Sequence, residues 1–232
     1  CLCLAWACSF PLSALIFALA ISGVNASAAG DKVFNIIEIT NFYGMLEDAN
    51  GDPVAAVMAK NIKDIVNGNP HRTLIVSGGD NYLGSILSNM LQGAPVMSAF
   101  NSIGVAVSTL GNHEFDWGLD TVTRNVVADY SHICSNLFYK GTDNRVFDLY
   151  KIFEKDGVKI AVVGAITEEL PDLVRADYVE DYEVRSIIDN VGEAAEDARA
   201  NGCRIVIALL HEGDNLDGKT GVVFDVADQL GG

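Results

Sequence analysis

The stretch TLGNHEFDWG, residues 109–118, places an amide, an imidazole and acidic side chains in one short segment. An apolar run at Val105–Val107 precedes it and predicts a buried strand, and a helical pattern at Leu119–Ala128 follows it. The polar segment therefore lies where a strand ends and a helix begins. In open α/β sheets, ligands and catalytic groups gather at such positions.

Three further apolar runs predict strands, at residues 33–40, 73–77 and 204–210. Helical patterns alternate with them, and Asp156-Gly157 predicts one inserted hairpin. This order predicts an α/β fold with a largely parallel sheet, in which the carboxyl ends of the strands share one edge. The polar residues that follow these strands are therefore expected to converge on one site: Asn41, Asp80, Asn112 with His113, and His211.

These side chains are suited to metal-assisted phosphoester chemistry. Asp80 can bridge two cations, Asn112 offers a carbonyl oxygen and His211 a ring nitrogen, a mixed set that favours Mn²⁺, Zn²⁺, Co²⁺ or Fe. Two metals ~3.5–4 Å apart hold a phosphate and activate water as a nucleophile. His113 remains free to stabilise charge or to protonate a leaving oxygen, and Asp116 can hold its tautomer.

Each of these residues also has a structural interpretation. Asp80 after two glycines can be a turn residue, Asn112 a helix-capping residue, and His211 a satisfied histidine at a strand end. Independent turn residues need not all carry ligand-type side chains, so their convergence favours a functional site.

The charge of the chain restricts its partners. The 232 residues carry a net charge of −16, which argues against binding a nucleic acid polymer or an anionic membrane. A small anionic substrate remains compatible when cations stand between it and the protein. The acidic run at Asp177–Glu183 is expected to form a solvated face.

The first thirty residues predict export. An apolar run from Leu12 to Val24 precedes Ala26-Ser27-Ala28, which gives a small-x-small cleavage pattern, although the cationic n-region is missing. A membrane anchor is the rival interpretation. Residues 1–30 are thus expected to be a signal peptide, and the folded part to be extracellular, cell-wall-associated or periplasmic. Cys134 and Cys203 then remain, and both are expected to be buried free thiols.

The chain resembles the secreted 5′-nucleotidase / 2′,3′-cyclic-nucleotide phosphodiesterase family of calcineurin-like metallophosphoesterases. The matching segments are ITNFYG at 39–44, SGGDNYLGS at 77–85, LGNHEFDWG at 110–118, YKIFEKDGVKIAVVGAIT at 150–167 and IALLHEG at 207–213. The resemblance implies a four-layer αββα sandwich with a dinuclear metal site, and hydrolysis of a nucleotide phosphoester. It also implies residue roles: Asp80 as bridging ligand, Asn112 and His211 as ligands of the second metal, and His113 with Asp116 as the catalytic dyad.

The chain departs from the family pattern in ways that affect the metals. The family's first motif is Asp-x-His, and Asn41 and Tyr43 stand at those positions. Asn41 can offer only a neutral carbonyl oxygen, and Tyr43 is a poor ligand unless ionised. A Gly-x-His-x-His segment and a C-terminal nucleotide-binding domain normally follow, so residues 31–232 are expected to form an incomplete domain, truncated at its C-terminal end.

This count of ligands predicts at most one weakly held metal. The leading hypothesis is a nucleotide phosphohydrolase of the 5′-nucleotidase or cyclic phosphodiesterase type. The alternatives are a catalytically decayed relative that acts as a binding or structural module, and a sulfur-oxidation-type hydrolase with another substrate.

Overall fold

The first sheet of the protein is wholly parallel. In the computed structural model, which describes residues 32–123, 127–213 and 218–230, this sheet has four strands. In their order across the sheet they are β1 (Asn35–Ile39), β2 (Thr73–Ser77), β3 (Val107–Ser108) and β4 (Ser131–His132). Every residue of β2 is buried, as its unalternating apolar sequence predicts for a central parallel strand.

The second sheet combines a hairpin with a parallel strand. Its strands are β6 (Tyr150–Lys155), β7 (Val158–Ile166) and β9 (Ile205–His211). Asp156 and Gly157 join β6 to β7 with φ of 48° and 74°, the pair of positive values that a type I′ turn requires. Strand β9 pairs with β7 in parallel and ends at His211, opposite Ile166.

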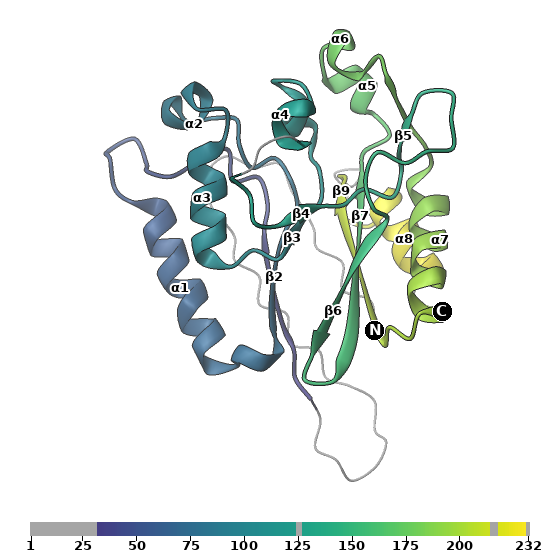
Figure 1. Ribbon diagram of the computed structural model, residues 1–232, viewed down its shortest axis with the longest axis horizontal. Coiled ribbons are helices and arrows are strands. Elements are labelled where there is room, and N and C mark those ends of the chain that lie inside the picture. Colours follow the sequence, from purple (N-terminus) through teal and green to yellow (C-terminus); the bar gives the residue numbers. More distant parts are fainter. Residues whose placement is uncertain (1–31, 124–126, 214–217, 231–232) are drawn as a thin grey trace.

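The two sheets pack face to face, and helices cover the outer face of each (Figure 1). Helices α1 (Val54–Gly68) and α3 (Ala94–Ile103) pack on the first sheet, and α7 (Ile187–Ala200) and α8 (Val222–Leu230) pack on the second. Apolar side chains of both sheets form a separate core between them: Leu74, Val76, Val107, Ile133, Ile160, Val162, Ile207 and Leu209. The four-layer αββα prediction is therefore confirmed.

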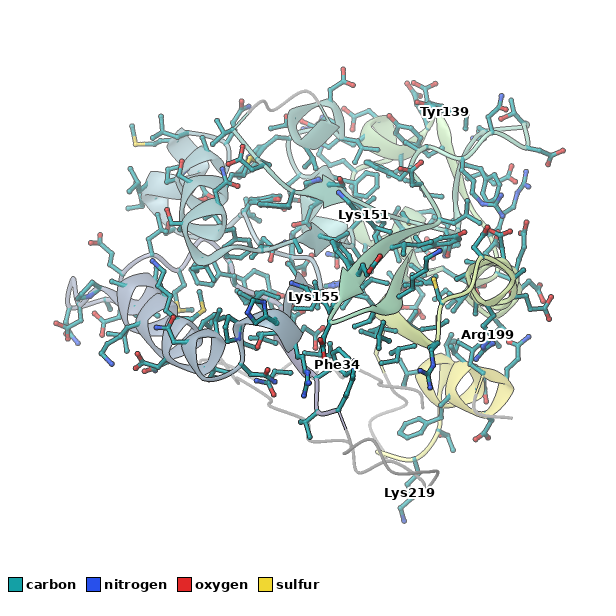
Figure 2. The ribbon with its side chains drawn as sticks, turned by 60° about the horizontal axis from the view of Figure 1, so that its bottom comes forward. Phe34, Tyr139, Lys151, Lys155, Arg199 and Lys219 are labelled. Atoms are coloured by element: carbon teal, nitrogen blue, oxygen red, sulfur yellow. The ribbon has the colours of Figure 1, made fainter. Side chains whose placement is uncertain are left out.

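A view from the lower edge of Figure 1 shows the same layers (Figure 2). Helix α1 and the pair α7 and α8 lie on opposite sides of the sheets, and Phe34, just before β1, lies between them against the inter-sheet core. Alternate residues of β7 face opposite ways, so that Ile160 and Val162 contact the first sheet while Ala161 and Val163 contact the helices.

Short elements surround the upper edge of the sheets in Figure 1, where α2 and α4 follow β2 and β3. They are α2 (Ile86–Met90), η2 (Asn112–Phe115), α4 (Asp120–Thr123), α5 (Leu170–Leu173) and α6 (Ala176–Val179), with a small antiparallel sheet of β5 (Leu137–Tyr139) and β8 (Tyr182–Val184). A further short helix, η1 (Pro70–Arg72), lies at the opposite edge, directly before β2.

Two local expectations hold in part. The helix expected over residues 119–128 is present as α4, Asp120–Thr123; residues 124–126 lie outside the described residues, and Val127 and Ala128 are not helical. Farther along, the side chain of Asn101 donates to Val127 O at 2.5 Å and accepts from the N–H of Asp129 at 2.9 Å, so these backbone groups bond outside a helix. The acidic run exposes Asp177, Glu180 and Asp181 to solvent as expected, but its apolar members pack inward: Val179 is buried, and Tyr182 packs edge-on against Phe115.

Cys134 and Cys203 are free and buried, as predicted. The expected signal peptide lies outside the described residues. Among the residues that are described, none of the helices is long and apolar enough to cross a membrane.

Candidate functional site

Asp80 lies at the centre of the polar residues that gather at the carboxyl ends of the strands. It follows Gly78-Gly79 after β2, is 3% exposed and adopts a left-handed conformation with φ of 56°. Its Oδ1 accepts the main-chain N–H of His113 at 2.9 Å. Its Oδ2 lies 3.4 Å from Nε2 of His211. The loops after β2 and β3 thus meet the end of β9 at one carboxylate.

His211 brings the second sheet into this site. Its Nδ1–H donates to Gly78 O at 2.7 Å, which fixes the ring orientation and directs Nε2 toward Asp80. Burial alone would lower the pKa of His211, but the hydrogen bond and the charge of Asp80 raise it to about 9. Burial likewise opposes ionisation of Asp80, yet His211 holds the pKa of that carboxyl below its ordinary value. The two side chains therefore form an ion pair that spans the two sheets.

The stretch 112–116 supplies the remaining predicted residues. His113 Nδ1 and Asp116 Oδ2 lie 2.6 Å apart, and both side chains are partly exposed, at 34% and 26%. The His113 imidazole is therefore held by Asp116 and remains accessible to solvent. Asn112 lies between Gly111, where an added Cβ would collide with Asp80 Oδ1, and His113, whose N–H donates to that oxygen. Within the described part of the chain, the side-chain amide of Asn112 forms no hydrogen bond.

Asn41 and Tyr43 follow β1 on the other side of Asp80. Asn41 N–H donates to Gly79 O at 3.0 Å, and the Asn41 amide oxygen is buried without a partner in the described residues. The Tyr43 hydroxyl donates to Asp80 Oδ2 at 3.2 Å, and its ring meets that of His113 edge-on with centroids 5.7 Å apart. Both residues have positive φ, 51° and 49°. Such strained non-glycine backbone is characteristic of functional sites.

Glu114 is a further member of this cluster that the sequence did not identify. Its carboxylate is 2% exposed and accepts the main-chain N–H groups of Asp80, Asn81 and Gly111 at 2.7, 2.9 and 2.6 Å. Burial and the charge of Asp80 raise the pKa of Glu114, and the hydrogen bonds from Asn81 and Asp80 oppose that rise. The sequence shows an acidic residue beside His113, but it does not show these three donors.

A second buried network lies behind the Asp80 loop. The Tyr82 hydroxyl lies 2.9 Å from that of Tyr130 and 2.9 Å from Nε2 of His132. Burial lowers the pKa of His132 to about 4, so this imidazole is neutral near pH 7. The network ties the chain after β2 to β4 and leaves His132 without a place in the exposed site.

The donors present fit one divalent cation better than two. Among the described residues, no three histidine, cysteine, aspartate or glutamate side chains gather as a metal site. Asp80 and His211 provide two such ligands, and Asn112, an amide, is a candidate third. Toward a second cation, the described residues beside Asp80 offer only the neutral oxygen of Asn41 and the Tyr43 hydroxyl. Burial and the charge of Asp80 raise the pKa of that hydroxyl, so it stays protonated.

Comparison with known proteins agrees with this geometry. The chain is 32% identical over 246 residues to cell wall protein Lmo0130 of Listeria monocytogenes, covering 90% of this chain and 31% of that protein. It is 31% identical over 151 residues to a 5′-nucleotidase of Vibrio vulnificus, covering 64% and 27%. No protein-family profile matches the chain.

Comparison with solved structures agrees with the sequence comparison. The crystal structure of the calcineurin-like phosphoesterase YfkN of Bacillus subtilis superposes with a TM-score of 0.72 at 24% identity, covering 84% of this chain and 67% of that one. This chain is a relative of the 5′-nucleotidases and has the calcineurin-like phosphoesterase fold.

The resemblance inferred from the sequence is thereby confirmed. The chain spans between 27% and 31% of the length of these curated relatives. The structure brings Asp80, His113, Asp116 and His211 together as predicted, with Asn41 and Asn112 in loops that contact Asp80 or its neighbours.

Proposed function

We propose that this chain carries the catalytic groups of an exported, metal-dependent phosphoester hydrolase that acts on nucleotides, of the 5′-nucleotidase or cyclic phosphodiesterase type. The observation that carries the proposal is the meeting of Asp80 and His211 across the two sheets, beside the exposed His113–Asp116 pair. The names of the relatives support a nucleotide substrate, and the similarity to a cell wall protein, together with the leader-like residues 1–30, supports export.

Asp80, Asn112 and His211 are proposed to hold one divalent cation, such as Mn²⁺, Zn²⁺, Co²⁺ or Fe. His211 is prepared for this role because Gly78 O fixes its Nδ1–H and leaves Nε2 to face the carboxylate. The Asn41 amide oxygen, which has no partner among the described residues, can serve as an additional donor. When bound, such a cation withdraws charge from the phosphate and activates water.

The family resemblance implies two cations, and the residues beside β1 do not fit the first of them. Tyr43 stays protonated and donates to Asp80 Oδ2, the carboxylate oxygen that also faces His211. We therefore propose a single metal for this chain. Mixed nitrogen and oxygen ligation with few charged donors predicts weak binding.

His113 and Asp116 are proposed as the catalytic dyad. The short contact to Asp116 holds the His113 ring through Nδ1 and leaves Nε2 without a hydrogen-bond partner among the described residues, so that it can protonate a leaving oxygen or stabilise phosphate charge. The partial exposure of both side chains leaves the pair accessible to a substrate from solvent. The net charge of −16 disfavours a nucleic acid polymer as substrate.

The second candidate function is a non-catalytic binding or structural module. The replacement of two ligands by Asn41 and Tyr43 specifically favours it, because these are the residues that remove the first metal. The two candidates differ in whether phosphate is released, and in whether restored ligands raise that release.

The test measures phosphate release from AMP and from a 2′,3′-cyclic nucleotide with added Mn²⁺, for the wild type and for His113→Asn. Metal-dependent release that the substitution abolishes supports the hydrolase. Asn41→Asp with Tyr43→His should then raise the rate if only the first metal is lost. Absence of release from the wild type and from the double variant supports the non-catalytic module and contradicts the hydrolase.

A further inference from the structure

Glu114 joins the two loops on which the proposed metal ligands lie. Its Oε2 accepts the N–H of Asp80 at 2.7 Å from the loop after β2, and the N–H of Gly111 at 2.6 Å from the loop after β3. Its Oε1 accepts the N–H of Asn81 at 2.9 Å. One carboxylate therefore satisfies three buried main-chain donors, which lie in the loops that follow β2 and β3.

The loops that Glu114 joins are in direct backbone contact. A Cβ atom on Gly79 would lie 2.4 Å from Gly111 N, and a Cβ atom on Gly111 would lie 2.2 Å from Asp80 Oδ1. The two loops lie so close together that the main-chain N–H groups of Asp80, Asn81 and Gly111 need an acceptor from another residue. An anionic acceptor between the loops is the means by which these donors are satisfied without water.

The conformation of Asp80 depends on such support. A left-handed backbone at a non-glycine residue is strained and persists only where surrounding contacts hold it. Asp80 has φ of 56°, and its N–H and that of the next residue both point at Glu114. The same conformation directs Oδ1 to the N–H of His113 and Oδ2 toward His211.

We propose that Glu114 is a positioning residue, which holds Asp80 in the geometry that presents its carboxylate beside Asn112 and His211. The Glu114 carboxylate bonds the main-chain N–H of Asp80 and forms no hydrogen bond to His113 Nδ1 or to the Asp80 carboxylate, so it acts through the main chain. The inference rests on the proposed function only in identifying that geometry as a metal site.

Glu114→Gln tests the proposal with the smallest change in shape. An amide retains one oxygen acceptor but turns an NH₂ group toward a main-chain donor, so one of the three bonds is replaced by a repulsive contact. Loss of an outer-shell partner typically weakens metal binding 10–100-fold. We expect a loss in that range for Mn²⁺, measured by isothermal titration and by the electron paramagnetic resonance signal of free Mn²⁺.

Two control variants distinguish a positioning role of Glu114 from the general effect of removing a carboxylate charge and from a general loss of stability. Glu38→Gln removes another buried carboxylate that interacts electrostatically with His211 but forms no hydrogen bond to either loop among the described residues. Val226→Ala opens space at a fully buried residue of α8, in the core that α7 and α8 form with the second sheet. Both control variants should retain an affinity for Mn²⁺ far higher than that of Glu114→Gln.

Amide resonances supply a readout that does not require metal. In Glu114→Gln the Asp80, Asn81 and Gly111 amides should exchange faster, and the His113 amide, which bonds Asp80 Oδ1, should shift. Unchanged Mn²⁺ affinity would overturn the proposal. If the wild type binds no Mn²⁺, the metal part of the proposed function fails. The His113 amide then decides the inference: a shift beyond that in Val226→Ala supports it, and no shift overturns it.

Discussion

The Tyr43 hydroxyl donates a hydrogen bond to Oδ2 of Asp80 at 3.2 Å, on the carboxylate that also faces His211. A hydroxyl that donates a hydrogen bond to this oxygen competes with any cation that binds to the same oxygen. Breaking this one contact should therefore change metal binding without changing the ligands.

Tyr43→Phe keeps the aromatic ring against His113 and removes only the donor. The competing hydrogen bond is worth about 0.5–1.5 kcal/mol, so Mn²⁺ should bind about two- to tenfold more tightly. Titration of Mn²⁺ into both proteins checks this. Equal or weaker affinity in Tyr43→Phe would show that the hydroxyl does not compete with the cation.

Asn41→Asp combined with Tyr43→His should create a second metal position. The new carboxylate and imidazole are ligand types that suit transition metals, and both lie beside Asp80. Mn²⁺ bound to the wild type should give the spectrum of isolated ions, and the double variant should show spin coupling between neighbouring ions. A double variant that still binds one uncoupled Mn²⁺ would contradict this account of Asn41 and Tyr43.

His113→Asn should reduce phosphate release about 10²–10⁴-fold, because general acid–base catalysis contributes about that much. Mn²⁺ affinity should change little, since the His113 contact to Asp80 is made by its main-chain N–H. Asp116→Asn should lower the rate while retaining the imidazole. A His113 variant with full activity would remove the dyad from the mechanism.

Gly111→Ala should disturb the site by sterics alone, because φ at Gly111 is −105° and alanine adopts it without strain. The added Cβ would meet Asp80 Oδ1 at 2.2 Å, and such overpacking costs about 1–3 kcal/mol of folding stability. Gly68→Ala in α1, with open space around its Cβ, is the control and should be neutral or slightly stabilising. Urea denaturation of both variants compares them, and equal stability would contradict the close approach of the two loops.

His132 should make stability depend on pH. Its pKa is about 4 in the folded protein against an ordinary 6.5, so the unfolded chain binds a proton more readily over this range. The stabilisation is fully present above pH 6.5 and is lost as the pH falls toward 4. The loss reaches about 3 kcal/mol. Urea denaturation at pH 7.5 and 4.5 gives the free energy of unfolding at each pH, and His132→Gln should lack this part of the loss at pH 4.5. An equal loss in the wild type and in His132→Gln would contradict the prediction.

The sequence predicts the positions of the site residues because strand periodicity is local. The apolar runs that become β2 and β9 place Asp80 and His211 at strand ends, and parallel pairing then brings such ends to one edge. The closeness of His113 to Asp116 follows from their spacing in one turn of η2. The four-layer arrangement came from the family resemblance, since strand patterns alone do not reveal that there are two sheets.

What the sequence cannot show are contacts set by tertiary packing. The three N–H groups that Glu114 accepts come from loops 33 or 34 residues away and from its own loop. The Tyr82 and His132 hydrogen bond likewise joins residues 50 positions apart, so no local pattern around His132 indicates it. The direction of the Tyr43 hydroxyl depends on a positive φ that no pattern in the sequence indicates.

The measurement that tests the central claim most directly is a Mn²⁺ titration of the wild-type protein and Asp80→Asn, followed by electron paramagnetic resonance. The account predicts one weakly bound, uncoupled Mn²⁺ per chain, and its loss in Asp80→Asn. Two tightly bound, coupled ions, or binding that survives loss of the Asp80 carboxylate, would contradict it.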